Sequence, residues 1–217
     1  MVRIPVEGLL FDCDGVLVDS IESAGRAWGV WSERWAPEFD FHRDIVHGVR
    51  AVETVRTLVA ADDVERANAE LERLEIEHVE GTAAIPGAVE LTDALPQGAW
   101  TVVTSGAREL AARRLASAGI ARPDGIVAAE DVSNGKPDPE PYRRGAELIG
   151  IDPAACVVFE DAPAGIAAAR AAGVGTIVGV GAGAAAGSPD VLVADLRDVS
   201  WDGAALVVTP AEPAPVA

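Results

Sequence analysis

Short apolar runs alternate with segments of helical periodicity over most of the 217 residues. The first apolar run, residues 6–11, ends abruptly in polar residues and predicts a buried strand. Further strands are predicted at 99–104, 125–129, 155–159 and 174–180, with helices between them at about 108–118, 142–149 and 162–172. This alternation predicts the α/β class, with a doubly wound parallel sheet covered by helices on both faces.

One long helical stretch interrupts this alternation between the first strand and the second. Apolar residues from about 20 to 81 follow helical spacing, among them Trp28, Trp31 and Trp35, a stripe more typical of packing than of a binding pocket. We therefore predict a catalytic core formed by residues 1–17 and 87–217 and an inserted α-helical cap domain formed by residues 18–86. The Pro/Ala-rich tail, residues 209–217, is expected to be poorly ordered.

Charge and composition exclude several classes of partner. The formal net charge of −18 argues against nucleic acid and against anionic membrane surfaces. No apolar run is long enough to span a bilayer, and the N-terminus lacks the features of a signal peptide. With only Cys13 and Cys156, no disulfide scaffold is expected, and a cytoplasmic location is the prediction. The oligomeric state is left open, with a monomer as the default.

Chemically useful side chains follow the predicted strands at their carboxyl ends, the edge at which open α/β sheets bind ligands. Asp12 and Asp14 follow the first strand, and two carboxylates this close can act as nucleophile and proton donor. An Asp-rich turn is the alternative. Thr104, Ser105 and Gly106 follow the second strand, where hydroxyls and helix amides suit a phosphate group, although a simple helix cap would leave the same pattern.

Two more segments add a cation and further acids. Lys136 is the only lysine among 17 basic residues, and a compact ammonium suits contact with both a carboxylate and a phosphoryl oxygen. A surface lysine beside a turn is the alternative. Glu160 and Asp161 follow the strand at 155–159, where their oxygens would suit Mg²⁺, although they could instead cap the next helix. Together with Asp12 and Asp14 they favour a metal site.

These segments resemble the four motifs of the haloacid dehalogenase superfamily, in particular its phosphatases with a helical cap. The matching segments are DCDGVLVDS at 12–20, VVTSG at 102–106, GKPDP at 135–139 and FEDAPAG at 159–165. The resemblance implies that Asp12 attacks phosphorus and that Asp14 protonates the leaving oxygen and then activates water. It also implies that Thr104 and Lys136 hold the phosphoryl group. Mg²⁺ would be bound by Asp12, the Asp14 carbonyl and Asp161, with assistance from Glu160.

The predicted cap carries residues that would select the substrate. His47, Arg50 and Glu53 lie in a segment that resembles the cap of sugar- and polyol-phosphate phosphatases. Arg50 would then reach a phosphate oxygen or a hydroxyl, and His47 and Glu53 would read hydroxyl groups, with Ser105 and Gly106 contributing from the core. The alternative is that Arg50 pairs with a local carboxylate and that His47 caps a helix.

The function predicted from these residues is Mg²⁺-dependent hydrolysis of a small sugar or polyol monophosphate through an aspartyl-phosphate intermediate. One alternative is an isomerase similar to β-phosphoglucomutase, but such enzymes carry a histidine in the first cap helix where this chain has Ala24. The other is an inactive binding or regulatory protein, which the complete set of Asp12, Asp14, Lys136 and Asp161 disfavours.

Overall fold

A six-stranded sheet forms the centre of the molecule. The computed structural model describes residues 1–211, so most of the tail expected to be poorly ordered lies outside the described residues. Every neighbouring pair in this sheet is parallel. The strands lie in the order β6 (Ile126–Val127), β5 (Trp100–Val103), β2 (Gly8–Phe11), β7 (Cys156–Glu160), β8 (Thr176–Val180) and β9 (Val191–Val193).

The strand order creates a switch point at β2. The first strand of this sheet along the chain lies in the middle, and the chain runs outward from it in both directions, first through β5 and β6 and then through β7, β8 and β9. This is the doubly wound order in which ligands bind beyond the carboxyl ends of the central strands. The predicted α/β class and parallel sheet are therefore confirmed.

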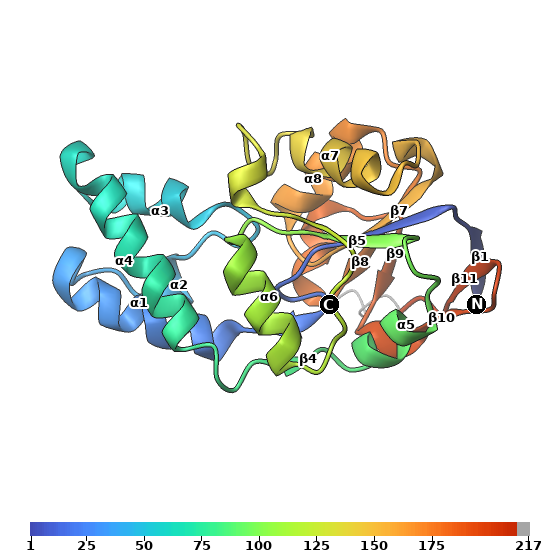
Figure 1. Ribbon diagram of the computed structural model, residues 1–217, viewed down its shortest axis with the longest axis horizontal. Helices are drawn as coiled ribbons and strands as arrows, with labels where there is room; N and C mark the ends of the chain where they lie inside the picture. The colour runs from blue at the N-terminus through green and yellow to red at the C-terminus, as the bar shows by residue number, and fades with distance from the viewer. Residues whose placement is uncertain (212–217) are drawn as a thin grey trace, which may run out of the picture.

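Helices cover both faces of the sheet, as Figure 1 shows. Successive side chains of a strand point to opposite faces, so Leu9 and Phe11 join one hydrophobic cluster and Leu10 joins the other. Helices α5 (Ala88–Ala94) and α6 (Arg108–Ser117) pack on the first cluster. Helices α7 (Glu140–Ile149) and α8 (Pro163–Ala172) pack on the second.

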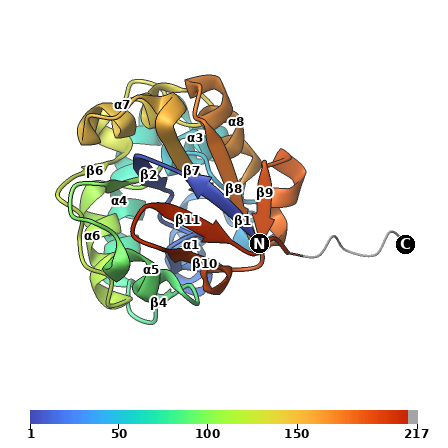
Figure 2. The same ribbon diagram turned by 90° about the vertical axis from the view of Figure 1, so that its right-hand side faces the viewer.

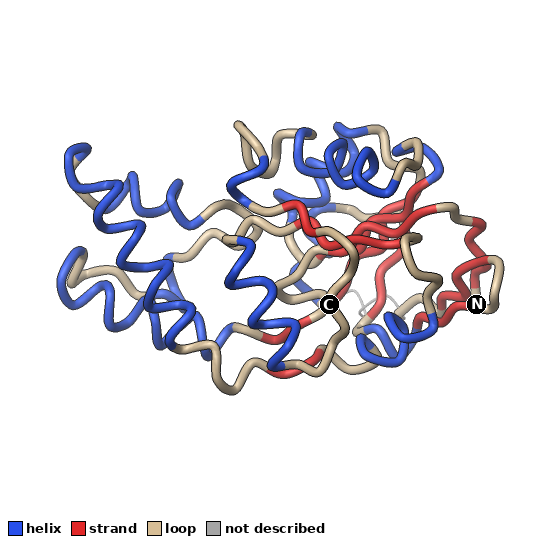
Figure 3. The backbone as a smooth tube through the Cα atoms, in the orientation of Figure 1, coloured by secondary structure: helices blue, strands red, loops and turns tan. Residues whose placement is uncertain are grey.

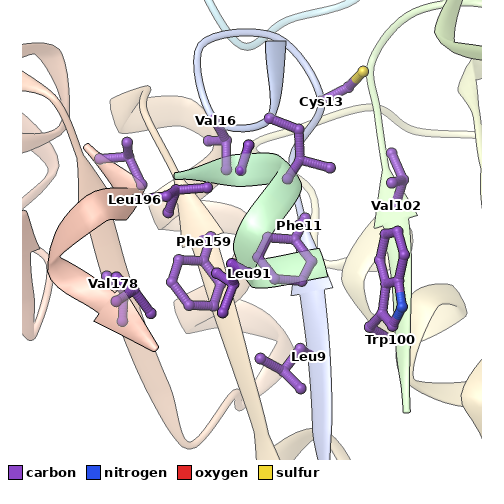
Figure 4. Packing of buried hydrophobic residues seen from close by; sticks show 14 of the residues in the cluster. Leu9, Phe11, Cys13, Val16, Leu91, Trp100, Val102, Phe159, Val178 and Leu196 are labelled. Atoms are coloured by element: carbon purple, nitrogen blue, oxygen red, sulfur yellow. The ribbon is translucent and has the colours of Figure 1, made fainter. Parts of the chain in front are cut away.

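Aromatic packing fixes the neighbours of β2 (Figure 4). The ring of Phe11 stacks on that of Phe159 from β7, with centroids 4.6 Å apart. The ring of Trp100 from β5 meets Phe11 edge-on at 5.8 Å. Phe11 directly precedes Asp12, so these contacts also hold the carboxyl end of β2 in position.

The helical stretch forms a separate group at one end of the molecule (Figure 3). It lies between two short antiparallel strands, β3 (Val18–Asp19) and β4 (Ala83–Ala84), which form the connection to the core. Its hydrophobic cluster includes Trp31, whose indole N–H donates to the carbonyl of Ala67 at 2.8 Å. The helices are α1 (Ile21–Trp35), α2 (Phe41–Asp44), α3 (Ala51–Leu58) and α4 (Val64–Glu77). The predicted division into domains at 17/18 and 86/87 falls beside β3 and β4 and stays a prediction.

A second sheet was not expected from the sequence. The chain start forms β1 (Val2–Pro5), which pairs antiparallel with β11 (Ala205–Val208), and β11 pairs with β10 (Val199–Trp201). Figure 2 shows this small sheet beside the N-terminus. The pairing joins segments about 200 residues apart, so no local pattern predicts it. Five 3₁₀ helices complete the described chain: Ala61–Asp63, Ala129–Asp131, Pro153–Ala155, Ala182–Gly187 and Leu196–Asp198.

None of the helices described in residues 1–211 combines the length and the apolar character that crossing a membrane requires.

We expect Phe159→Ala to lower the free energy of unfolding by about 3–5 kcal/mol, because it leaves a cavity between two buried strands. Urea unfolding followed by tryptophan fluorescence would measure this loss. Val30→Ala, at a side chain that is 47% exposed, is the control and should change stability by less than about 0.5 kcal/mol. Equal effects of the two substitutions would contradict the packing described for Phe159.

Candidate active site

The carboxyl ends of β2, β5 and β7 open into a cavity of about 540 Å³ between the sheet and the helical cap. The core contributes polar groups from three neighbouring strand ends, as the strand order requires. Helices α1 to α3 and the loops between them supply part of the opposite wall. Of the residues predicted from the sequence, those lining the cavity are Asp12, Asp14, His47, Thr104, Ser105, Gly106 and Asp161.

Lys136 does not itself line this cavity; it lies buried in contact with Asp12, the nucleophile predicted from the sequence. Its ammonium group donates to Asp12 Oδ1 at 2.6 Å and to Glu160 Oε1 at 2.6 Å. A third bond, of 3.0 Å, runs to the carbonyl oxygen of Val103 at the end of β5. All three N–H groups of the lysine therefore have acceptors, and Asp12 is held in one orientation.

Glu160 is completely buried and is held by four donors. Besides Lys136, the hydroxyl of Tyr142 donates to Oε1 at 2.6 Å, and the backbone N–H groups of Asp161 and Ala162 donate to Oε2. A Cβ at Gly165 would lie 1.7 Å from Oε1, so only glycine fits there. These contacts make Glu160 a fixed anchor for the Lys136 ammonium.

The charged groups at this site shift one another's pKa values. Burial raises the pKa of Asp12 to about 7, although the Lys136 ammonium opposes the rise. Burial alone would lower the pKa of Lys136, but the carboxylates of Asp12 and Glu160 outweigh it and raise the pKa above its ordinary value. Lys136 is therefore a permanent cation that favours the ionised form of Asp12.

Asp161 adds a third carboxylate beside Asp12 and Glu160. One oxygen from each of the three lies within 4.8 Å of the others. Burial, and then the charges of Asp12 and Glu160, raise the pKa of Asp161 to about 8. Within residues 1–211 the Asp161 carboxylate forms no ion pair with a basic side chain. Three hard oxygen donors with one lysine between them suit a divalent cation such as Mg²⁺.

The turn after β2 brings Asp14 and Asp161 to the same cavity. Gly15 has a φ of +83°, and a Cβ there would lie 2.1 Å from Asp161 Oδ2. Glycine is therefore required both for the turn and for the close approach of Asp161. The hydroxyl of Ser20 donates to Asp14 Oδ1 at 2.6 Å. No described residue donates a hydrogen bond to Oδ2 of Asp14, which leaves that oxygen available for proton transfer.

The predicted substrate-binding residues divide into two groups. Thr104 Oγ1 accepts a bond of 3.0 Å from the N–H of Gly106, and Ser105 donates to the carbonyl of Gly48 in the cap at 2.9 Å. These residues line the cavity, as does His47.

Arg50 and Glu53 form the second group, and within the described chain they do not line the cavity. Arg50 Nε donates to Glu53 at 3.0 Å, and Arg50 Nη1 reaches the carbonyl of Ser133 at 3.3 Å. The structure thus has the local ion pair that was the alternative for Arg50, in a contact between cap and core. Their contact with substrate stays a prediction.

Sequence reasoning missed several residues of the site. The sequence predicts that Tyr142 lies on a helix but suggests no function for it. The one available signal is that Tyr142 is the only tyrosine of the chain. Arg114 on α6 is another missed residue; it lines the cavity and pairs there with Glu75 of α4. Cys13 lies between the two aspartates but is a poor candidate nucleophile, because burial together with the charges of Asp14 and Asp12 raises the pKa of its thiol well above the ordinary value.

Sequence comparisons agree with this geometry. A family model of haloacid dehalogenase-like hydrolases matches residues 6–173. Hexitol phosphatase A of Escherichia coli is 40% identical over 172 residues, which cover 77% of this chain and 80% of that protein. Glycerol-1-phosphate phosphohydrolase 2 of Saccharomyces cerevisiae is 36% identical over 185 residues, covering 79% and 74%.

Comparison with solved structures also finds a hydrolase of the same fold. A hydrolase from Pseudomonas syringae superimposes with a TM-score of 0.76 at 27% identity and covers 88% of this chain and 94% of that one. The predicted family and the predicted class of phosphoric monoester hydrolase are confirmed by these relatives. The family model matches residues 6–173, which include β2, β5 and β7 and the strand ends at the cavity, so the chain belongs to the haloacid dehalogenase-like hydrolases and is a phosphatase of that family.

Proposed function

We propose that the protein hydrolyses the phosphate monoester of a small sugar or polyol through an aspartyl-phosphate on Asp12. The observation that carries the proposal is the pair of aspartates at one cavity: Asp12 is fixed by Lys136, and Asp14 keeps one oxygen free. The related proteins named hexitol phosphatase and glycerol-1-phosphate phosphohydrolase support the substrate class.

The reaction uses these two carboxylates in two steps. In the first, a carboxylate oxygen of Asp12 attacks phosphorus while the bond from phosphorus to the ester oxygen breaks, and Asp14 gives its proton to the departing alcohol. In the second, Asp14 takes a proton from water as that water attacks the aspartyl-phosphate. Inorganic phosphate leaves and Asp12 returns to a carboxylate. Thr104, which lines the cavity, would hold the phosphoryl group, and Lys136 would join it by exchanging one of its three present acceptors for a phosphoryl oxygen.

Mg²⁺ fits the acidic end of the cavity. We assign Asp12, Asp161 and the backbone carbonyl of Asp14 as its ligands, whereas Glu160, with both oxygens already bonded to four donors, serves to hold Lys136. When bound, the ion neutralises the charge of the phosphoryl group and of the carboxylates, whose raised pKa values it would lower.

The cavity suits a small substrate. Its volume is about 540 Å³. On the cap side it is lined mainly by apolar side chains, among them Trp28, Phe41 and Ile45. His47 and Thr54 are polar groups of the cap that reach the same space and suit hydroxyl groups of the substrate. Trp28, expected only as packing, therefore serves in both the cap cluster and the cavity wall.

Hydrolysis is favoured over phosphate transfer between hydroxyls of one sugar. Ala24 lines the cavity at the position where mutases of this family carry a histidine, and α1 contains no histidine. In this chain the hydroxyl of Ser20, rather than a histidine, donates a hydrogen bond to Asp14. We further propose a cytoplasmic enzyme, because the buried Cys13 and Cys156 are both free thiols, and a monomer as the active form.

We expect Asp12→Asn to lower phosphate release by at least about 10³-fold, because an amide cannot attack phosphorus. The measurement is release of phosphate from a panel of sugar, polyol and nucleotide monophosphates, with and without Mg²⁺. Asp93→Asn, at an exposed aspartate on α5, is the control and should retain full activity. Activity that survives Asp12→Asn would contradict the aspartyl-phosphate mechanism. A wild-type protein that releases no phosphate from any compound of the panel would favour the mutase or an inactive protein.

Removal of the metal by a chelator should abolish activity, and added Mg²⁺ should restore it. Asp161→Asn is expected to raise the Mg²⁺ concentration for half-maximal activity by at least about tenfold, because it removes a charged ligand. Asp190→Asn, a half-exposed aspartate that pairs with Arg170 far from the cavity, should leave that concentration unchanged. An unaltered Mg²⁺ requirement in Asp161→Asn would overturn the assignment of Asp161.

A further inference from the structure

One buried arginine connects the core of the active site to the cap. Arg114 on α6 is only 5% exposed and lines the cavity. Its Nη1 forms an ion pair with Asp14 Oδ1 at 3.0 Å, and its Nη2 donates to Glu75 Oε1 at 3.3 Å. Glu75 belongs to α4 of the cap and is itself buried. A single guanidinium therefore spans the proton-transferring aspartate and a cap helix.

One buried N–H group of Arg114 argues against a purely structural role. Its buried Nε has no acceptor among the described residues. Buried arginines that only stabilise a fold normally have their N–H groups satisfied, because an unpaired buried donor is costly. The ion pairs of Arg114 in the described chain are confined to Asp14 and Glu75. Its position is thus set by two carboxylates that belong to different parts of the molecule.

Both groups that hold Asp14 lie at the boundary of core and cap. Ser20 follows β3, one of the two connecting strands, and Arg114 reaches the cap through Glu75. Both contact the same oxygen, Oδ1. With Oδ1 held by both groups, Oδ2, to which no described residue donates, is the oxygen left to exchange a proton with the leaving group.

We propose that Arg114 is a positioning residue that couples closure of the cap to the alignment of Asp14. With the cap closed, Glu75 holds the guanidinium against Asp14 Oδ1 and the acid faces the leaving oxygen. With the cap open, the guanidinium loses one of its two carboxylates and holds Asp14 less firmly. The proton donor is then fully aligned only when the substrate is enclosed. The inference rests on the proposed role of Asp14 in hydrolysis.

The test compares two substrates that differ in their need for an acid. An alkyl ester such as glycerol 1-phosphate needs protonation of its leaving oxygen, whereas 4-nitrophenyl phosphate releases a stable anion. We expect Arg114→Gln to lower kcat/KM by about 10²-fold for the alkyl ester and by less than about fivefold for the aryl ester, the pattern of a weakened general acid. Glu75→Gln should show the same selectivity, because it removes the cap side of the contact.

The chain offers a matched control in Arg113, the preceding residue on α6, which is exposed and pairs with Glu109. Arg113→Gln should leave both substrates unaffected. Equal loss for both esters in Arg114→Gln, as expected for a merely structural or phosphate-binding arginine, would overturn the proposal. An unaffected Glu75→Gln would overturn the coupling to the cap.

Hydrogen–deuterium exchange gives a readout that does not depend on turnover. Arg114→Gln and Glu75→Gln should each increase exchange in β3, β4 and α4 relative to the wild type and to Arg113→Gln, because the cap has lost a contact with the core. Unchanged exchange would also overturn the coupling. Failure of the proposed function can be distinguished from failure of this inference, because the wild-type protein would then release phosphate from neither ester.

Discussion

The structure of the active site depends on the burial of one ammonium group between carboxylates. Burying a charge costs several kcal/mol unless it is paired and hydrogen-bonded. Lys136 meets this condition with acceptors from three neighbouring strand ends: Asp12 after β2, Val103 in β5 and Glu160 in β7. The same three contacts that stabilise the lysine therefore fix the relative positions of the strand ends. The orientation of Asp12 is a consequence of this arrangement.

The excess of negative charge around Lys136 explains other features of the site. Three carboxylates lie close together with one lysine among them, and burial raises the pKa of Asp12 and of Asp161. Such a site is completed by a further cation, which is the physical basis for expecting Mg²⁺. The close packing also requires glycine at Gly15 and Gly165, where any side chain would collide with Asp161 or Glu160.

The cap meets the core through a few polar contacts in addition to the connecting strands. Individual hydrogen bonds of this kind exchange for water at a small net free energy, about 0.5–1.5 kcal/mol each. The cap also has its own hydrophobic cluster, so separating it from the core need not open either cluster. These bonds run from Ser105 to Gly48, from Arg50 to Ser133, from Arg114 to Glu75 and from Ser117 to Thr82. Asp14 is contacted at this boundary by Arg114 and by Ser20, the residue that follows β3.

The parallel α/β sheet and the motif residues at its strand ends could be predicted from the sequence, because apolar periodicity and the residues after a strand are local properties. Which distant groups meet depends on the folded structure. Tyr142 reaches Glu160 across 18 residues, Arg114 reaches Glu75 across 39, and β1 pairs with β11 from the other end of the chain. The pairing of Arg50 with Glu53 could be expected from their spacing, but its bond to the carbonyl of Ser133 in the core could not. Such partners depend on how the elements pack in three dimensions, and no spacing along the chain encodes them.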